Sequence, residues 1–319
     1  SGSAVADVSA LGSILIPAMK AKGYPKAVAA AVMSSAATLA VIIPPSIPMI
    51  LYAVMAETSV VQMFVAGIIP GVLGGIGLMG MAYHFARRYN LPVEESLKWA
   101  RVKQTFREAF WAFTLPLIIL GAIFGGVVTA TEGAALAVLA ALVIGLAIYR
   151  ELDWAHLKSA VIEGGVQTAV VMLLVASSAL LGVYLTEIQA PQKLARAVAE
   201  FTTNKWVVLA LLNLLFLLLG MFLHSAAAII LVVPVVMPLV KAAGIDPVHF
   251  GLIVTINLGI GQQTPPVASV LMVACSIARA SVWEVSRVNI YFIGVLFAVL
   301  MLITYVPVSG LFLVEVFYR

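Results

Sequence analysis

The chain has 319 residues, of which 63% are hydrophobic and 10% are charged, and its formal net charge is +4. Soluble domains carry about 25% charged residues, so this composition excludes a water-soluble protein and makes the lipid bilayer its main solvent. The apolar runs are continuous rather than alternating, which favours membrane helices over an outer-membrane barrel. A single cysteine excludes a disulfide framework and a thiolate metal cluster. We interpret the basic charge through membrane topology and expect no nucleic-acid partner.

The first half of the chain predicts one hairpin arm followed by spanning helices. The arm covers residues 1–22, and a span over 25–57 is interrupted within 37–48 by prolines and small residues. A second span is expected over 61–84. The polar segment 89–107 is expected to be a cytoplasmic loop.

The second half repeats this pattern after three further spans, over 110–127, 134–148 and 160–185. An amphipathic, interfacial segment is expected over 191–205. The apolar run 206–240 is too long for one span and has two prolines near its end, which predicts a second hairpin. An interrupted span over 249–278 and a last span over 288–313 complete the chain.

One segment occurs twice without a gap, at residues 1–49 and 222–270, an offset of 221. The alignment places Pro17 on Pro238 and Gly23 on Gly244, and it also brings Pro44-Pro45 onto Pro265-Pro266. Proline and glycine determine where helices start, break and end, so the two copies are expected to share a backbone. Paired, interrupted hydrophobic segments in two halves of a membrane protein indicate the binding site of a transporter.

The two copies are expected to face opposite sides of the membrane, because an odd number of spans, five, separates Gly23 from Gly244. If the Gly23 side is cytoplasmic, thirteen of the eighteen basic residues lie inside, and the other five are Lys193, Arg196, Lys205, Lys241 and Arg319. The odd number of spans therefore predicts an inverted repeat, and the positive-inside rule predicts a periplasmic C-terminus. Three spans and a hairpin arm precede the second hairpin, so we expect the same elements upstream of the first copy, in a longer protein.

This organisation predicts four regions. Residues 1–88 form the first repeat of a transport unit, 89–107 the cytoplasmic loop, 108–205 scaffold helices and 206–319 the second repeat.

Each copy offers a polar hairpin tip and a non-helical stretch within the following span. The tips are Ser1-Gly2-Ser3 and His224-Ser225, and the stretches are 38–48 and 259–266. Backbone freed from helical hydrogen bonds is tolerated at membrane depth only where it is buried in protein or lines a cavity. Its carbonyls and nearby hydroxyls suit a hard cation, whereas the adjoining helix N-termini suit an anion. Alternatively, the prolines only kink structural helices.

The candidate sodium-binding residues are Gly2, Ser3, Thr38, Pro44, Ser46, Thr255, Gly259, Gly261 and Thr264. Na⁺ is the only metal that we expect, as a coupling ion, with no transition metal and no other cofactor. Known enzyme signatures and ATP-binding motifs are absent from the sequence, so transport would be driven by an ion gradient or by a separate subunit. The two tip serines and the histidine leave an intramembrane hydrolase as an alternative.

The motifs SGSAVAD, IIPPSIPMILY and IGQQTPPV resemble the large membrane subunit of tripartite ATP-independent periplasmic (TRAP) transporters, and the resemblance covers essentially the whole chain. It implies an all-α polytopic membrane protein with inverted repeats, two re-entrant hairpins, two discontinuous helices and an elevator mechanism in the bacterial inner membrane. It also implies Na⁺ coupling, a small four-helix membrane subunit that can be fused upstream, and a periplasmic substrate-binding protein. The implied cargo is an organic acid: sialic acid, favoured by GQQTPPVASV, a C4-dicarboxylate or a sugar acid.

By this resemblance Ser1, Ser3 and Ser46 line the substrate region, and the second tip adds His224 and Ser225. Many family members carry an acid where this chain has His224, so the role of that charge is in question. A stand-alone sodium/carboxylate symporter is the alternative that needs no binding protein.

Overall fold

The computed structural model describes residues 2–91, 98–202 and 204–318, which form α-helices, one π-helical turn and short connections. Nine helices in these ranges are long and apolar enough to cross a membrane. The predicted all-α polytopic membrane fold is confirmed. The chain divides into two compact units, residues 1–92 with 174–319 and residues 93–173, and the second boundary falls within helix α7 (Trp154–Glu187).

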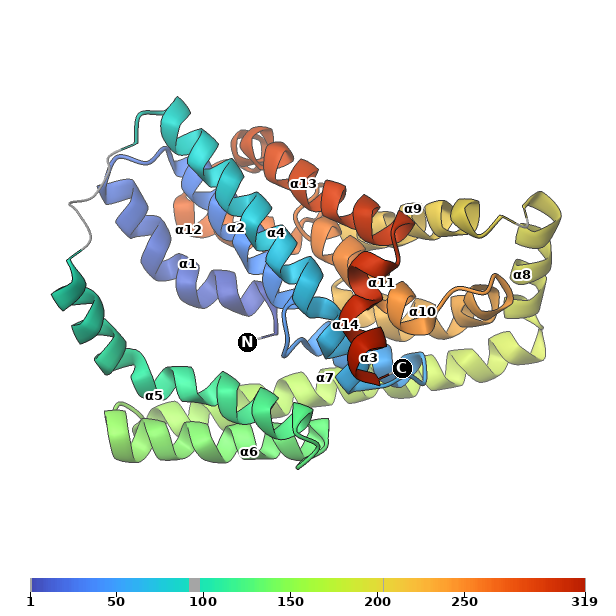
Figure 1. Cartoon of the computed structure of the whole chain (residues 1–319), viewed down its shortest axis with the longest axis horizontal. Helices are drawn as coiled ribbons and strands as arrows, with labels where there is room; N and C mark the ends of the chain where they lie inside the picture. The colour runs from blue at the N-terminus through green and yellow to red at the C-terminus, as the bar shows by residue number, and fades with distance from the viewer. Residues whose placement is uncertain (1, 92–97, 203, 319) are drawn as a thin grey trace. The chain divides into compact units, whose positions relative to one another are not determined.

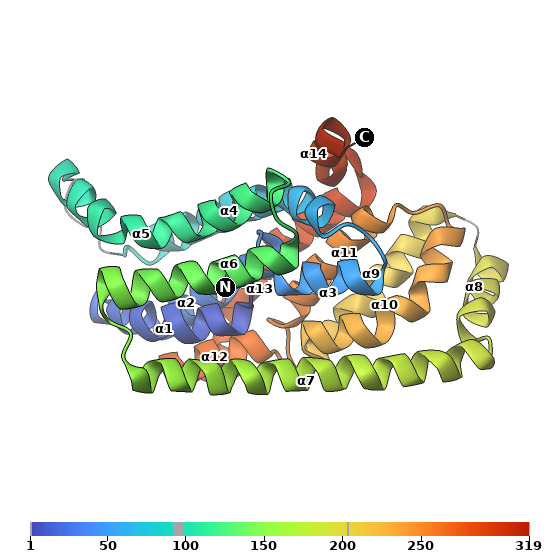
Figure 2. The same cartoon turned by 90° about the horizontal axis from the view of Figure 1, so that it is seen from below.

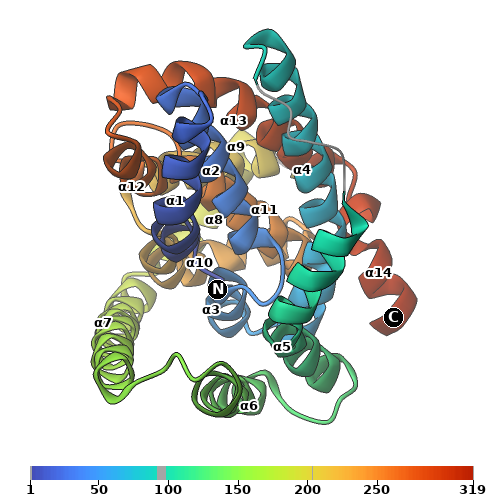
Figure 3. The ribbon, with the colours of Figure 1, turned by 90° about the vertical axis from the view of Figure 1, so that its left-hand side faces the viewer.

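The unit of residues 93–173 contains α5 (Trp99–Phe124), α6 (Ala130–Val143), the π-helical turn η1 (Ile144–Tyr149) and the first half of α7. Helices α5 and α6 lie side by side (Figure 3). The Tyr149 hydroxyl donates a 2.8 Å hydrogen bond to the Glu108 carbonyl and so holds η1 against α5. Most apolar side chains of this unit are exposed. They therefore offer a surface suited to lipid.

The other unit holds both copies of the repeated segment (Figure 1). The first copy forms α1 (Ala4–Ala21), α2 (Lys26–Ile42), α3 (Ile47–Met55) and α4 (Val60–Arg88). The end of α7 leads into the short α8 (Ala190–Phe201), which has the predicted amphipathic pattern. The second copy then forms α9 (Lys205–Phe222), α10 (Ser225–Ala242), α11 (Pro247–Gly261), α12 (Ser269–Ala278), α13 (Val282–Tyr305) and α14 (Val308–Tyr318).

The structure confirms that the two copies share a backbone. Helix α10 has the bounds of α1 displaced by 221 residues at both ends. The glycines that follow, Gly23 and Gly244, both have positive φ, at 86° and 66°. The Pro44-Pro45 and Pro265-Pro266 peptide bonds are both cis. The correspondence continues beyond the segment aligned by sequence, because α4 and α13 begin at nearly equivalent positions.

Each copy packs partly against helices of the other copy. Helix α1 packs against α2 of its own copy and α12 of the other, as Figure 3 shows. Helix α10 packs correspondingly against α11 and α3 (Figure 2). The core of the unit lies between α2 and α11, and every residue from Val248 to Gly261 is buried. Neither copy can therefore bury its apolar surface without the other.

Two element predictions need correction. The expected loop 89–107 is shorter, because α5 begins at Trp99, and 92–97 lie outside the described residues. Residues 99–107 contain no glycine or proline and are rich in helix formers, so the helix of the next span continues into them. The expected last span 288–313 is two helices, since Pro307 lacks an N–H and disfavours helical geometry at Val306.

Candidate functional site

The first interruption is a short turn closed by a serine. Pro44 and Pro45 have no N–H groups and so remove the helical donors for the carbonyls of Ala40 and Val41. The fully buried Ser46 hydroxyl donates to the Val41 carbonyl at 2.6 Å and accepts from the Met49 N–H at 3.4 Å. One side chain therefore ends α2 and caps α3.

The first hairpin tip lies directly on this interruption. The Gly2 carbonyl accepts a 3.3 Å hydrogen bond from the Ile47 N–H, and a Cβ on Gly2 would lie 2.8 Å from the Pro45 carbonyl oxygen. Ser3 caps α1, because its hydroxyl accepts from the Ala6 N–H at 3.4 Å. Ser1, also predicted here, lies outside the described residues.

The second tip and interruption are joined in a similar way. The Val267 N–H donates to the Met221 carbonyl at 3.3 Å, which ties the loop between α11 and α12 to the end of α9. His224 caps α10, with its Nδ1 accepting from the Ala226 N–H at 3.4 Å, and the buried Ser225 follows as the first helical residue. The Thr264 hydroxyl donates to the Ile260 carbonyl at 2.9 Å.

A buried hydrogen-bond network joins the two copies. The Gln263 side chain donates to the Thr38 hydroxyl at 2.6 Å and accepts from the Ser35 hydroxyl at 2.9 Å. Ser35 also lies 2.9 Å from the side-chain oxygen of Asn289 on α13, and these four residues are fully buried. Their polar groups are satisfied by one another, so the network fixes α2 against the second interruption.

Some of the predicted sodium-binding residues contact one another in the structure, and others do not. A Cβ on Gly259 would lie 2.8 Å from the Thr38 methyl group, so these two positions are in contact across the copies. Gly261 instead contacts the backbone of α9, where a Cβ would lie 2.5 Å from Gly220. The buried Thr255 lies within α11 and donates to the Gly251 carbonyl at 2.9 Å. Pro44 is buried in the first interruption.

The sequence reasoning missed Ser34, Ser35, Gln263 and Asn289. Their signal is present, since Ser34-Ser35 and Asn289 are polar residues inside apolar helices, and such residues face a protein interior rather than lipid. Hydroxyl and amide side chains thus gather at Gln263 in the second interruption, whereas the first offers the Ser46 hydroxyl and backbone carbonyls. Across the described residues, no group of three His, Cys, Asp or Glu side chains is placed to hold a metal ion.

The comparisons with known proteins identify the family. Residues 1–309 match the family described as tripartite ATP-independent periplasmic transporter, DctM component. Over 316 residues, 98% of this chain, it is 39% identical to the isethionate TRAP transporter permease protein DctMQ of Oleidesulfovibrio alaskensis. It is 36% identical over 311 residues (98% of this chain) to the C4-dicarboxylate TRAP transporter large permease protein DctM of Pseudomonas aeruginosa. It is 35% identical over 307 residues (96%) to the 2,3-diketo-L-gulonate TRAP transporter large permease protein YiaN of Escherichia coli.

The chain spans 49% of the first relative's length, and 73% and 72% of the other two. The family description and the three names all denote a transporter component and not an enzyme, so the hydrolase alternative is set aside. The chain belongs to the DctM family of TRAP transporter membrane components.

Proposed function

We propose that this chain imports an organic acid together with Na⁺, as the large membrane subunit of a three-part transporter. The observation that carries the proposal is that in each copy the hairpin, at or next to its tip, is hydrogen-bonded to the chain at a helix interruption, through Gly2 and Ile47 in one copy and Met221 and Val267 in the other. Transporters bind substrate and ion at such discontinuous helices between repeats. The three relatives are named for isethionate, C4-dicarboxylates and a diketogulonate, all of which are organic anions.

Na⁺ suits the interruptions because their polar lining is neutral and rich in oxygen. The proline pairs remove helical donors from nearby carbonyls. The Ser46 hydroxyl bonds one of these, that of Val41, and the Thr38 hydroxyl accepts from Gln263 of the second interruption. The proposed sodium-binding residues remain Gly2, Ser3, Thr38, Pro44, Ser46, Thr255, Gly259, Gly261 and Thr264.

The anion would be held by the helix N-termini at the two tips and interruptions. N–H groups at the start of a helix point along its axis and favour a negative charge. Helices α1 and α10 begin at Ser3 and His224-Ser225, and α3 begins after Ser46. Ser1 belongs to the same proposed group, which is the reason to include it in mutagenesis.

We further propose that both copies move as one body in an elevator mechanism. The Gln263, Thr38 and Ser35 contacts support this, because they join the copies through fully buried hydrogen bonds. A periplasmic binding protein would deliver the cargo. A small four-helix subunit would complete the membrane part, and the name DctMQ of one relative fits a fusion of the two. By the positive-inside rule, the C-terminus would lie on the periplasmic side.

The test is uptake into proteoliposomes that contain the chain, its small subunit and the binding protein. Sialic acid, isethionate, succinate and 2,3-diketogulonate would be compared, with an inward Na⁺ or K⁺ gradient. We expect uptake of one organic acid that requires both Na⁺ and the binding protein. Equal uptake with K⁺ would contradict sodium coupling, and full activity without the binding protein would indicate the stand-alone symporter.

Variants at Ser46 connect that test to the site. Ser46→Ala removes the hydroxyl that bonds the Val41 carbonyl, and should reduce uptake by about tenfold, whereas Ser46→Thr should restore most of it. Ser13→Ala is the matched control, because Ser13 is an exposed residue of α1 whose hydroxyl bonds only the Ala10 carbonyl. Equal uptake by both alanine variants would remove Ser46 from the proposed site.

A further inference from the structure

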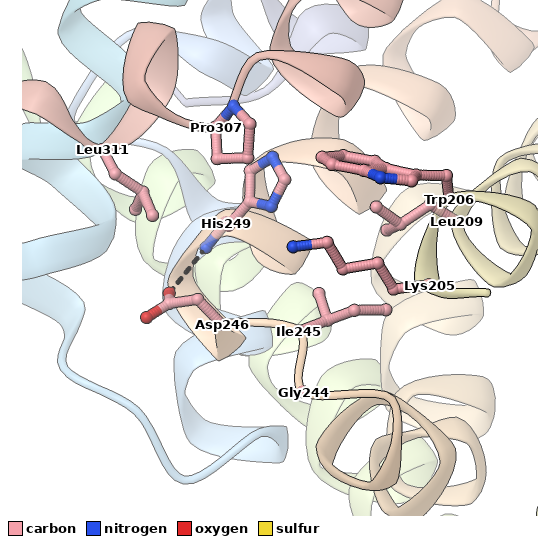
Figure 4. A pocket seen from close by; sticks show the side chains of 9 residues that line it. All are labelled: Lys205, Trp206, Leu209, Gly244, Ile245, Asp246, His249, Pro307 and Leu311. Carbon is pink, nitrogen blue, oxygen red and sulfur yellow. Dashed lines mark hydrogen bonds between the residues drawn. The ribbon is translucent and has the colours of Figure 1, made fainter. Parts of the chain in front are cut away.

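A cavity of about 170 Å³ lies at the end of the second copy that is remote from the interruption. It opens where α9 and α11 begin, and Figure 4 shows Lys205, Trp206, Asp246 and His249 around it. Helix α11 has 15 residues, so roughly 22 Å of helix separates this cavity from the second interruption. The cavity is therefore distinct from the proposed transport site.

One wall of the cavity is formed by Lys205. Among the described residues no carboxylate lies within ion-pair distance of the Lys205 ammonium, which instead lies 4.6 Å from the centre of the Trp206 ring. The Asp246 carboxylate lies at the start of α11, where it accepts from the N–H groups of Val248 and His249 at 2.8 and 3.0 Å. That carboxylate is directed to the helix terminus.

A buried imidazole faces the same space. His249 is 3% exposed, and its Nε2 lies 2.7 Å from the Ile303 carbonyl, so Nε2 carries the proton and donates it. In Figure 4 the ring and the Lys205 ammonium point toward the same part of the cavity. The N-terminus of α9, capped by the neutral Asn204 side chain, also lies here and adds positive potential, whereas that of α11 is already covered by the Asp246 carboxylate.

The remaining walls are apolar. Trp206, Leu209 and Leu311 line the cavity beside the charged groups. Its volume is close to the roughly 150 Å³ of an engineered cavity that accommodates benzene, so an organic molecule of a few carbon atoms fits. Purely inorganic ions would leave these apolar walls uncovered.

We infer that this cavity is a second binding site, which takes a small organic monoanion, a carboxylate or sulfonate. The charged end lies against Lys205 and the start of α9, and the carbon end packs against Trp206 and Leu311. The carboxylate of Asp246 in the lining disfavours a second negative charge on the ligand. The site does not depend on the proposed transport function.

The first copy provides an internal comparison. The positions equivalent to Asp246 and His249 are Pro25 and Val28, which cannot supply the same polar lining. Beside them Lys26 forms a 3.1 Å ion pair with Glu284, so the lysine there is already neutralised. Only the second copy pairs a lysine lacking a carboxylate with a buried imidazole at this corner, within the described residues.

The test measures binding through the fluorescence of Trp206. A variant in which Trp99, Trp111, Trp154 and Trp283 are replaced by Phe leaves Trp206 as the only indole. This protein, in lipid nanodiscs, would be titrated with propionate and ethanesulfonate at constant ionic strength. Propanol and propylammonium, of similar size but neutral and positively charged, are the ligand controls. We expect saturable changes with the two anions alone.

Substitutions assign the signal to the cavity. Lys205→Gln should weaken binding by about tenfold, whereas Lys205→Arg should keep it within about threefold. Lys193→Gln on α8 is the matched control and should leave binding unchanged. A non-saturable response, an equal response to propanol, or unchanged binding by Lys205→Gln would overturn the proposal.

One further measurement distinguishes whether the bound anion is the transported cargo or another organic acid. If the occupant is the transported cargo, Lys205→Gln should raise the KM for uptake without changing kcat. If it is another organic acid, uptake should keep its KM while propionate binding is lost.

Discussion

The two copies of the repeat share one backbone but differ in the side chains at equivalent positions. Matching prolines end α2 and α11, and α1 and α10 have the same length. At the tips, however, Gly2-Ser3 stands opposite Leu223-His224, and at the interruptions Ile42 stands opposite Gln263. Prolines and glycines thus give the two copies matching backbones. At each pair of equivalent positions, however, mainly one of the two residues supplies a polar group that joins the copies.

The two copies also differ in their side chains at the end remote from the interruption. In the first copy Lys26 is paired with Glu284, whereas in the second copy Lys205 and His249 border a cavity. Symmetry therefore describes the framework, and the departures from symmetry indicate where each copy has its own role. Substitutions at equivalent positions can test which departures matter.

The largest effect is expected at position 261. A Cβ on Gly261 would lie 2.5 Å from backbone atoms of Gly220, which cannot rotate away, whereas the first copy has Ala40 at the equivalent position. Gly261→Ala should separate α9 from α11 and cost about 3 kcal/mol of unfolding free energy. The midpoint of thermal unfolding in detergent measures it.

Gly80→Ala is the control for that substitution. Gly80 lies on an exposed face of α4, and among the described residues no atom beyond its own helix backbone would lie within 4 Å of a Cβ there. Alanine there should be neutral or should stabilise by up to about 1 kcal/mol, because alanine favours helix. Equal effects of the two substitutions would show that α9 and α11 do not approach closely.

The next effect is expected at position 263. Gln263→Leu mimics the apolar Ile42 of the first copy and removes the bonds to Thr38 and Ser35. It should cost about 2 kcal/mol, since the buried partners lose their hydrogen bonds. Thermal unfolding again provides the measurement. Gln262→Leu is the neighbouring control: among the described residues its buried side-chain nitrogen has no hydrogen-bond partner, so its replacement should be neutral or stabilising. A comparable loss for both variants would contradict the network.

The interruptions were predictable from sequence, and the network was not. Proline acts on the backbone wherever it occurs, so Pro44-Pro45 and Pro265-Pro266 located both breaks correctly. The bond between Gln263 and Thr38 joins residues 225 positions apart, and it depends on how α2 packs against α11. The local sequence pattern does not show which residues so far apart in the chain come into contact. The polar residues inside α2 and α13 were visible, but their partners were not.

Local chemistry also explains the two wrong element ends. Pro307 divides the expected last span by the same effect that was recognised at the proline pairs. The start of α5 at Trp99 was missed because polarity indicated a loop, whereas lysine, arginine and glutamine also favour helix. Hydropathy reports burial in lipid, not where a helix begins.

A smaller effect is expected at the first tip. Gly2 has a φ of 73°, where an L-residue is disfavoured, whereas Leu223 at the equivalent position has a φ of −111°. Gly2→Ala should cost about 1.5 kcal/mol from backbone strain, together with contact against the Pro45 carbonyl. Leu223→Ala should cause no backbone strain. Uptake and thermal unfolding would be measured together, and an unaffected Gly2→Ala variant would show that the tip does not rest on the interruption.

The smallest effect is expected at the ion pair of the first copy. Lys26 and Glu284 are 3.1 Å apart, and both side chains are 44% exposed, so solvent screens their attraction. Lys26→Gln should cost about 0.5 kcal/mol at low salt and less as the salt concentration rises. A double-mutant cycle with Glu284→Gln isolates the pair, because each single variant also loses its other contacts. A coupling energy that does not fall with salt would mean that the Lys26–Glu284 pair is shielded from water. The two corners would then be more alike in their exposure to solvent than the 44% exposed side chains suggest.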